Sequence, residues 1–459
     1  MKIDELRRRL TAADQQHVLA FWDELSESRR AALAETLAQI DFEQLARLVA
    51  DKQAGPNWKE LARRAESPPA VRLDGSGSPV DARTATQMGA EALASGEVAA
   101  LLVAGGQGTR LGYDHPKGLF PLGPVSGRSL FALLIDKLSA AAERNKATIP
   151  LYIMTSPATH DETAEFFAAH DNLGLSQRDL RLFCQGTMPA VDAATGKLLM
   201  ARKSELALSP DGHGGVVAAL ARSGMLDEMC ERGVRRVFYF QVDNPLVPMC
   251  DPAILGYHLA ARSEMSTLVI SKNDPLERVG NVVSIDRRVQ IIEYSDLPKQ
   301  DALRRDADGG LTLWAGNTAV HVIDVDFLSR CADQADALPF HRANKSVSYL
   351  DANGRLIEPD EKNAIKFERF VFDLLPLAES SLVVEVDRRT AFAPVKEADD
   401  VDKVRQQMID LDRARVRAAG GDVADGIDVE IHPRLAADPE ALRSQLPPDG
   451  RVTAPRYFC

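Results

Sequence analysis

From Ile3 to about Ala65, apolar residues recur every three or four positions, as in Val18, Phe21 and Leu25. An α-helix has 3.6 residues per turn, so this spacing places the apolar side chains on one face. The pattern predicts several amphipathic helices in this region. The next stretch, ESPPAVRLDGSGSPVD at 66–81, is rich in Pro, Gly and Ser and predicts an extended connector.

After about residue 96 the pattern changes, because short apolar runs now alternate with helical spacing. Runs at 98–104, 150–155 and 235–242 indicate buried strands, and helical patterns begin at Ser129 and Ala158. This alternation is typical of βαβ units, which build a mostly parallel sheet with helices on both faces. Between 263 and 292 the apolar runs lie closer together, and there we expect antiparallel strands.

The tail begins at about Asp402 as a charged helical pattern and ends in a Pro-rich segment. At 459 residues the chain exceeds the size at which single cores stop growing, about 250 to 300 residues. The sequence therefore predicts an α/β protein with three regions: an N-terminal helical region and linker at 1–95, a main domain at 96–400 and a small C-terminal region at 401–459.

Composition excludes several classes of protein. The formal net charge of −12 argues against a nucleic-acid surface, which needs clustered Lys and Arg. No apolar run approaches 18 residues, so we expect no membrane span, and the opening MKIDELRRRL lacks the apolar stretch of a signal peptide. We therefore expect a cytoplasmic protein. The five cysteines are scattered without a CxxC pair, which argues against a disulfide framework or a zinc site.

One glycine-rich stretch stands directly after a predicted strand: LLVAGGQGTRLGYDHPKGLFPLG at 101–123. In open α/β sheets, ligands bind outside the carboxyl ends of the strands. Glycines there let the backbone approach a ligand, and their N–H groups can point at phosphate oxygens. Arg110 and Lys117 add positive charge. The stretch predicts a polyphosphate site, although a glycine-rich turn that only reverses the chain stays an alternative.

Two better-known phosphate loops are absent from this stretch. The GxxxxGK[ST] loop fails because Lys117 follows Pro116 and precedes Gly118, and GxGxxG fails because Leu111 takes the place of the last glycine. These departures argue against a P-loop kinase and a nicotinamide dehydrogenase.

AGGQGTRLG followed by HPKG resembles the signature of the UDP-sugar pyrophosphorylases, and among them the eukaryotic-type UDP-N-acetylglucosamine pyrophosphorylases. Further blocks agree in the same order: YIMTS, CQGTMPA, SPDGHGG, QVDN, VGNVV, IEYSD, WAGNTAVH, AIKFERFVFD and FAPVKEAD. The resemblance implies a Rossmann-like mixed, mostly parallel sheet of the nucleotidyltransferase (GT-A-like) type. It also implies a uridylyltransferase that forms a UDP-sugar and pyrophosphate from UTP and a sugar 1-phosphate. No protein partner is evident.

The same resemblance assigns roles to individual positions. The catalytic cations would be Arg110, Lys117 and Lys396. The nucleotide would contact Ala104, Gly105, Gly106, Gly108, Thr109, Gln185, Gly212 and Lys366. Asp243 ends the apolar run at 235–242 and would hold Mg²⁺, which needs one or two carboxylates besides substrate phosphates and water. Without the resemblance, Asp243 would equally suit a turn or a helix cap.

The sugar would contact His213, Gly280, Glu293 and Asn317. His213 stands where the N-acetylglucosamine enzymes usually have asparagine, whereas UDP-glucose pyrophosphorylases tend to have histidine. N-acetylglucosamine 1-phosphate is the predicted substrate, with glucose 1-phosphate or a broad range of sugar phosphates as the alternative.

Two other classes of protein remain alternatives. A non-catalytic sugar-nucleotide-binding protein could dispense with the three predicted catalytic cations. A glycosyltransferase would need a DxD motif after a buried strand. Neither of the DxD sequences, at 306–308 and 324–326, follows a predicted buried strand, and both are expected in turn or capping roles instead.

Overall fold

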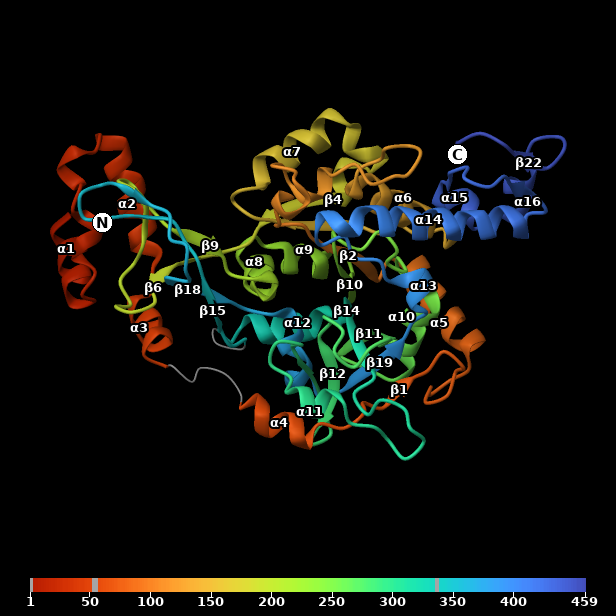
Figure 1. Cartoon of the computed structure of the whole chain (residues 1–459), viewed down its shortest axis with the longest axis horizontal. Coiled ribbons are helices and arrows are strands. Elements are labelled where there is room, and N and C mark those ends of the chain that lie inside the picture. Colours follow the sequence, from red (N-terminus) through yellow and green to blue (C-terminus); the bar gives the residue numbers. More distant parts are fainter. Residues whose placement is uncertain (1–2, 52–56, 335–337) are drawn as a thin grey trace. The chain divides into compact units, whose positions relative to one another are not determined.

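The computed structural model of the chain describes residues 3–51, 57–334 and 338–459 (Figure 1). By internal contacts the chain divides into two compact units. Unit 1 consists of the described residues within Met1–Asn57, Gln185–Val216 and Asp336–Asp373, and unit 2 of those within Trp58–Cys184, Val217–Ala335 and Leu374–Cys459. The predicted three-region division stays a prediction.

Unit 2 is organised around a sheet that has ten strands among its described residues. Its main path is β1 (Ala70–Val71), β19 (Ser381–Glu385), β11 (Met265–Ser271), β14 (Ala315–Asp324), β10 (Arg236–Gln241), β2 (Val98–Val103), β3 (Leu151–Thr155) and β4 (Leu180–Cys184). Neighbouring strands are parallel except at β14, which is antiparallel to both β10 and β11. The predicted mixed, mostly parallel sheet is confirmed.

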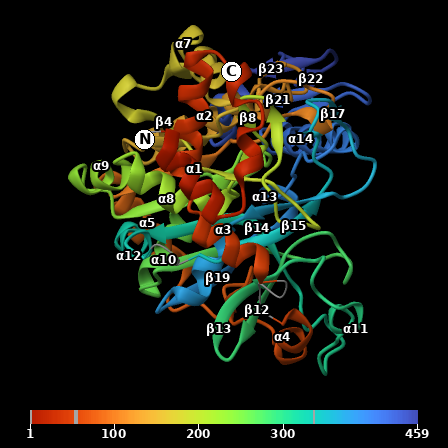
Figure 2. The same ribbon diagram turned by 90° about the vertical axis from the view of Figure 1, so that its left-hand side faces the viewer.

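The predicted antiparallel strands between 263 and 292 are also confirmed. β12 (Asn281–Ile285) and β13 (Arg288–Ile292) form a hairpin that joins the sheet through a pairing of β12 with β14 (Figure 2). The connector at 66–81 contributes more than a linker, because β1 within it forms a parallel edge strand beside β19.

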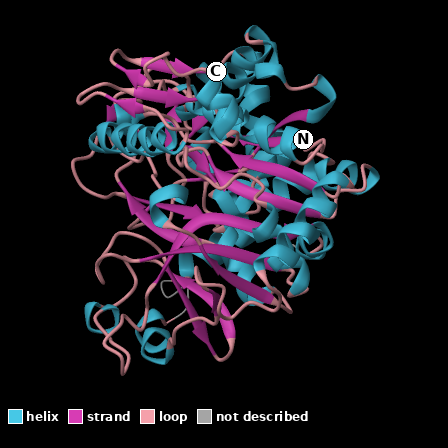
Figure 3. Ribbon diagram, turned by 90° about the vertical axis from the view of Figure 1, so that its right-hand side faces the viewer, coloured by secondary structure: helices cyan, strands magenta, loops and turns pink. Residues whose placement is uncertain are grey.

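Helices flank the sheet of unit 2 (Figure 3). Alternate strand residues such as Ala100, Leu102 and Phe238 form one core with apolar residues of α5, α6 and α10. Tyr152 and Arg181, on β3 and β4, instead reach Glu228 of α9. The helices of this unit are α4 (Trp58–Arg64), α5 (Ala82–Ala94), α6 (Leu130–Arg144), α7 (His160–Ala169), α9 (Met225–Glu231), α10 (Pro252–Ala260), α11 (Lys299–Ala302), α12 (Val325–Ala332) and α13 (Arg388–Ala391). α8 (Val216–Arg222) leads from one unit to the other along the chain.

The predicted charged helix of the tail is α14 (Ala398–Ala418), and Glu397 caps its first turn. The segments that follow are α15 (Pro433–Ala436), α16 (Pro439–Ser444) and the parallel strand pairs β20 (Asp422–Val423) with β22 (Arg451–Val452) and β21 (Val429–Ile431) with β23 (Arg456–Phe458). Val416, Val429 and Phe458 are among the residues of a small core that ties these elements to the end of α14.

Unit 1 contains the predicted N-terminal helices α1 (Ile3–Ala12), α2 (Glu27–Gln39) and α3 (Phe42–Ala50), drawn in red in Figure 1. Leu6, Leu10 and Leu37 of these helices share a core with Val191 and Phe367. The strands of this unit pair antiparallel: β5 (Thr187–Pro189) with β9 (Leu208–Pro210), β7 (Met200–Arg202) with β8 (Glu205–Leu206), β16 (Tyr349–Leu350) with β17 (Leu356–Ile357), and β18 (Ala364–Glu368) with both β6 (Val191–Asp192) and β15 (His341–Lys345).

Within the described ranges, no helix combines the length and the hydropathy that crossing a lipid bilayer requires.

Candidate active site

The glycine-rich stretch folds as a compact loop at the carboxyl end of β2. Backbone hydrogen bonds close it, because the Lys117 N–H donates to the Gly106 carbonyl (3.0 Å) and the Gly108 N–H donates to the His115 carbonyl (2.9 Å). The Gly105 carbonyl accepts from the Ser156 hydroxyl (2.7 Å) at the end of β3. The 3₁₀ turns Thr109–Leu111 and Lys117–Leu119 then carry the two cations. The predicted residues of this loop, Ala104 through Lys117, are therefore held at one edge of the sheet.

Gly106 and Gly108 occupy different surroundings in this loop. A methyl group added to Gly108 would lie 2.7 Å from the Tyr113 carbonyl oxygen, so the protein itself requires glycine there. At Gly106 an added methyl group would meet no atom of the described chain within 4 Å, and the residue is exposed. Packing within the protein therefore gives no reason for glycine at Gly106, whereas close approach of a ligand to the backbone does.

Lys117 lies in one electrostatic group with the cations Arg110 and Lys396 and the carboxylates Asp243 and Asp400. Burial is the main cause that lowers the pKa of the Lys117 ammonium; Asp243 opposes this shift, and Arg110 and Lys396 add to it. Poor solvation and neighbouring cations both disfavour the charged form of a lysine, and an anion bound beside it would favour that form. The structure thus brings together all three predicted catalytic cations and the predicted metal ligand within unit 2.

Asp243 and Lys396 are adjacent through the backbone. The Val395 N–H donates to the Asp243 carbonyl (2.8 Å), and the Val242 N–H donates to the Val103 carbonyl (3.1 Å), so both residues stand beside the end of β2. Lys396 precedes α14, and its N–H donates to the Asp400 carboxylate (2.8 Å).

Asn244 is a supporting residue for which no role is predicted from the sequence. Its side chain is buried, its amide donates to the Ala391 carbonyl (2.9 Å), and its side-chain oxygen accepts from the Ala393 N–H (3.1 Å). These bonds fasten the turn after Asp243 to the segment that leads to Lys396. The partners lie almost 150 residues away in the sequence, and no local pattern signals such a pairing.

Three of the predicted sugar-binding residues also lie together in unit 2. The Asn317 N–H donates to the Gly280 carbonyl (2.8 Å), and a methyl group on Gly280 would lie 3.1 Å from a carboxylate oxygen of Glu293 and 3.6 Å from the Asn317 Cβ. The Asn317 side-chain oxygen accepts from the Ala319 N–H (3.0 Å), which leaves the amide group as a hydrogen-bond donor. The carboxylate of Glu293, a hydrogen-bond acceptor, and the amide of Asn317, a donor, therefore lie on either side of Gly280.

The remaining predicted residues belong to unit 1. Gln185 is buried at the start of its middle segment, and the Gly186 carbonyl accepts from the Asp211 N–H (3.1 Å). This bond brings Gln185 close to Gly212, which has φ +85°. A methyl group on Gly212 would lie 2.4 Å from the Arg369 carbonyl oxygen, so glycine is required there by the protein.

His213 packs among aromatic rings. Its ring centroid lies 5.3 Å from that of Phe370 and 5.6 Å from that of Phe372, and its Nδ1 accepts from the Val371 N–H (3.1 Å). Burial, with a smaller contribution from His341, lowers the pKa of His213 to about 4. The ring is therefore neutral near pH 7, and its Nε2 is left as the donor. Lys366 lies on β18, whose continuation at Arg369 bonds to both Asp211 and Gly214.

The donor set around Asp243 bears on the choice of metal. The described residues contain no group of three or more His, Cys, Asp or Glu side chains that could hold an ion. Asp400, the other carboxylate in the electrostatic group, accepts from the N–H groups of Lys396 and Glu397. One carboxylate suits Mg²⁺, which keeps several waters and binds substrate phosphates, but it does not suit Zn²⁺, which needs three or four protein ligands.

The DxD sequence at 324–326 departs from its expected environment. We expected no buried strand before it, but Asp324 ends the largely buried strand β14. Its carboxylate pairs with His258 (3.0 Å) and Arg236 (3.5 Å) and makes no side-chain cap for α12. Asp308 accepts from the Gly310 N–H (3.2 Å), as expected for a turn.

Comparisons with known proteins identify the family of the chain. Residues 66–423 match the profile of a family described as UTP–glucose-1-phosphate uridylyltransferase. The human UDP-N-acetylhexosamine pyrophosphorylase-like protein 1 is 36% identical over 413 residues, covering 87% of this chain and 81% of that protein. The UDP-N-acetylglucosamine pyrophosphorylase of Saccharomyces cerevisiae is 33% identical over 452 residues, covering 94% of each.

Solved structures show the same fold. The uridine diphosphate N-acetylglucosamine pyrophosphorylase of Trypanosoma brucei, solved with an inhibitor, has a TM-score of 0.81 and 26% identity, covering 99% of this chain and 98% of that one. A UDP-glucose pyrophosphorylase of Leishmania major has a TM-score of 0.62 at 19% identity, a likeness of fold alone, and covers 83% of this chain and 79% of that one. The chain therefore belongs to the UTP–glucose-1-phosphate uridylyltransferase family, and it is a uridylyltransferase.

Proposed function

We propose that the chain forms UDP-N-acetylglucosamine and pyrophosphate from UTP and N-acetylglucosamine 1-phosphate. The observation that carries this proposal is the electrostatic group of Arg110, Lys117, Lys396 and Asp243 at the carboxyl ends of β2 and β10. A non-catalytic binding protein would not need these three cations together, whereas a reaction that moves negative charge onto a leaving pyrophosphate does.

The sugar phosphate oxygen attacks the α-phosphorus of UTP in line, the bond to the bridging oxygen breaks, and pyrophosphate leaves. The attacking oxygen is already anionic, so no general base is needed, and catalysis depends on alignment and charge neutralisation. Arg110 and Lys117 stabilise the charge of the leaving pyrophosphate, and Lys396 aligns the α-phosphate. The open side of Gly106 lets the triphosphate approach the backbone of the loop.

Mg²⁺ is the proposed cofactor, and Asp243 is its protein ligand. When bound, the ion supplies Lewis-acid neutralisation of phosphate charge. Asn244 fixes the turn that positions the Asp243 carboxylate.

The remaining residues recognise the uridine and the sugar. Gln185 offers both a donor and an acceptor to the edge of the uracil, Gly212 contacts the nucleotide through its backbone, and Lys366 contacts the nucleotide phosphates. Glu293 accepts from sugar hydroxyls, and the free amide of Asn317 donates to the N-acetyl oxygen. The relatives named UDP-N-acetylglucosamine pyrophosphorylase support this choice of sugar.

The test measures the turnover of purified Asp243→Ala and Lys396→Ala variants. Each should lose at least about a hundredfold in kcat, because a preorganised electrostatic partner of the transition state is removed. Lys403→Ala is the matched control, since Lys403 is exposed on α14 only seven residues further along, and it should keep normal turnover. Near-normal turnover of a folded Asp243→Ala or Lys396→Ala variant would remove that residue from the mechanism.

A further inference from the structure

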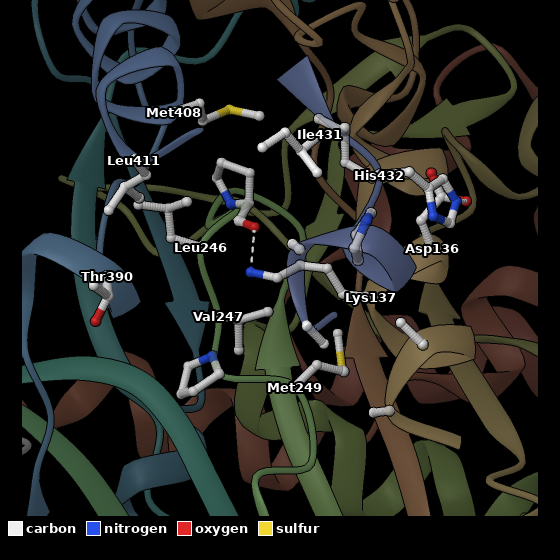
Figure 4. A pocket seen from close by; sticks show the side chains of 18 of the residues that line it. Asp136, Lys137, Leu246, Val247, Met249, Thr390, Met408, Leu411, Ile431 and His432 are labelled. Carbon is white, nitrogen blue, oxygen red and sulfur yellow. Dashed lines mark hydrogen bonds and ion pairs between the residues drawn. The ribbon is translucent and has the colours of Figure 1, made fainter. Parts of the chain in front are cut away.

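A cavity in unit 2 includes none of the predicted site residues. It has a volume of about 310 Å³ and lies between α6, the segment 245–252, α14 and the segment 430–433 (Figure 4). This volume is at the lower end of the range of small-molecule sites.

Most of the lining of this cavity is apolar. Its apolar side chains include Leu133, Leu246, Val247, Met249, Met408, Leu411 and Ile431. The two methionines are unbranched and flexible, so they can adapt to a bound apolar group.

The carboxylates of the lining already have partners. Asp136 accepts from Arg128 (2.7 Å), Asp412 accepts from Arg415 (2.6 Å), and Glu430 accepts from the Ser126 N–H (2.7 Å). Asp251 caps α10 through the Ala253 N–H (2.8 Å). None of these negative charges requires a ligand.

Lys137, in contrast, has no oppositely charged partner among the described residues. Its ammonium donates to the neutral Pro245 carbonyl (2.9 Å), the dashed line in Figure 4, and no carboxylate of the described residues lies within 4.0 Å of it. Burial, with Arg415 adding and Asp412 opposing, lowers the pKa of Lys137 to about 7. An anion beside this ammonium would favour its charged form.

The partner of Lys137 connects the cavity to the reaction. Pro245 lies two residues after Asp243, and Asn244 between them ties the turn to the segment that leads to Lys396. An anion that competes with the Pro245 carbonyl for Lys137 would release one of the bonds that hold this turn.

We infer that this cavity binds a small monoanion with an apolar body, its charge on Lys137 and its body among Leu246, Met249 and Met408, and that binding slows uridylyl transfer. The binding step is independent of the proposed function, and only the inhibition depends on it.

Calorimetric titration with octanoate tests the binding, and octan-1-ol serves as the uncharged control. Octanoate should bind saturably at a 1:1 ratio and octan-1-ol at least about tenfold more weakly, as expected when a hydrogen bond to a charged group is lost. Lys137→Met should weaken octanoate binding by about the same factor. Arg144→Met, which removes an exposed cation from the same lining, should leave it unchanged.

Met408→Trp is a second variant, which keeps Lys137 and fills the cavity, and it should abolish octanoate binding. In the wild type, octanoate should lower turnover, and in Met408→Trp it should not. Absence of saturable octanoate binding, or equal binding by wild type and Lys137→Met, would overturn the site. Saturable binding with unchanged turnover of an active enzyme would overturn the inhibition alone, and an inactive wild type would instead refute the proposed function.

Discussion

Gly106 and Gly108 are two residues apart, and their different surroundings lead to opposite predictions for the same substitution. Gly106→Ala should fold with an unchanged melting temperature, because the added methyl group meets no atom of the described chain. It should raise the KM for UTP by about tenfold or more, as expected when roughly 1.4 kcal/mol of binding is lost. Gly108→Ala should instead lose about 1–3 kcal/mol of stability, because the methyl group would collide with the Tyr113 carbonyl.

Thermal unfolding and steady-state kinetics of the two purified variants distinguish these effects. An unchanged KM for UTP in Gly106→Ala would show that the open side of Gly106 does not face the nucleotide.

His213 predicts a pH dependence of stability. Its folded pKa of about 4 lies below the ordinary value of 6.5, so protonation favours the unfolded chain. The stability associated with neutral His213 is complete above about pH 6.5 and is lost as the pH falls toward 4. Between pH 7.5 and 5.5 this residue alone should remove about 1 kcal/mol from the free energy of unfolding.

Urea denaturation of wild type and His213→Asn at the two pH values measures this loss. The asparagine oxygen can still accept from the Val371 N–H, so the variant should show a pH dependence smaller by about 1 kcal/mol. Equal pH dependence in the two proteins would mean that the ring is not buried in its neutral form.

Local sequence patterns predicted some residues of the candidate site and gave no signal for others. Gly106, Arg110 and Lys117 could be predicted from the sequence because they stand in one short stretch after a recognisable strand. Asn244 was missed because its side chain bonds to backbone groups far along the chain. The surroundings of His213 depend likewise on the segment 370–372, and nothing near residue 213 signals that packing.

At the scale of single elements, the first turn of α14 controls where Lys396 lies. The Asp400 carboxylate accepts from the N–H groups of both Lys396 (2.8 Å) and Glu397 (2.9 Å). Asp400→Ala should therefore cost about 1 kcal/mol of stability and lower kcat more than it raises KM, because the helix start that positions Lys396 loses its cap.

Asp399→Ala is the matched control, since this neighbouring side chain is exposed on the same helical turn. It should alter neither kcat nor stability by much. If both variants kept the kinetics of the wild type, the cap of α14 would have no part in catalysis.

The order of elements in the sheet was only partly predictable. Strands β2, β3 and β10 appear in the sequence as apolar runs, and their parallel pairing follows from the helices between them. The position of β14 does not follow, because insertion of an antiparallel strand between β10 and β11 is decided by pairing over long sequence distances. The missed strand before Asp324 is a consequence of this gap.

At the scale of the whole molecule, the sequence did not predict which segments of the chain come together to form unit 1. Its N-terminal helices share their core with segments near residues 191 and 367, and hydrophobic periodicity says which face of a helix is buried but not against which partner. The family resemblance, in contrast, extends through blocks of both units, and it gave the fold and the reaction class that the comparisons confirm.

The most direct test of the central claim is the release of pyrophosphate from UTP in the presence of Mg²⁺ and, in parallel, N-acetylglucosamine 1-phosphate, glucose 1-phosphate or galactose 1-phosphate. We predict equimolar formation of pyrophosphate and UDP-sugar, fastest with N-acetylglucosamine 1-phosphate. A preference for glucose 1-phosphate would contradict the proposed sugar and direct attention to His213. No pyrophosphate release with any of the three sugar phosphates, from a folded protein that binds UTP, would contradict the account as a whole.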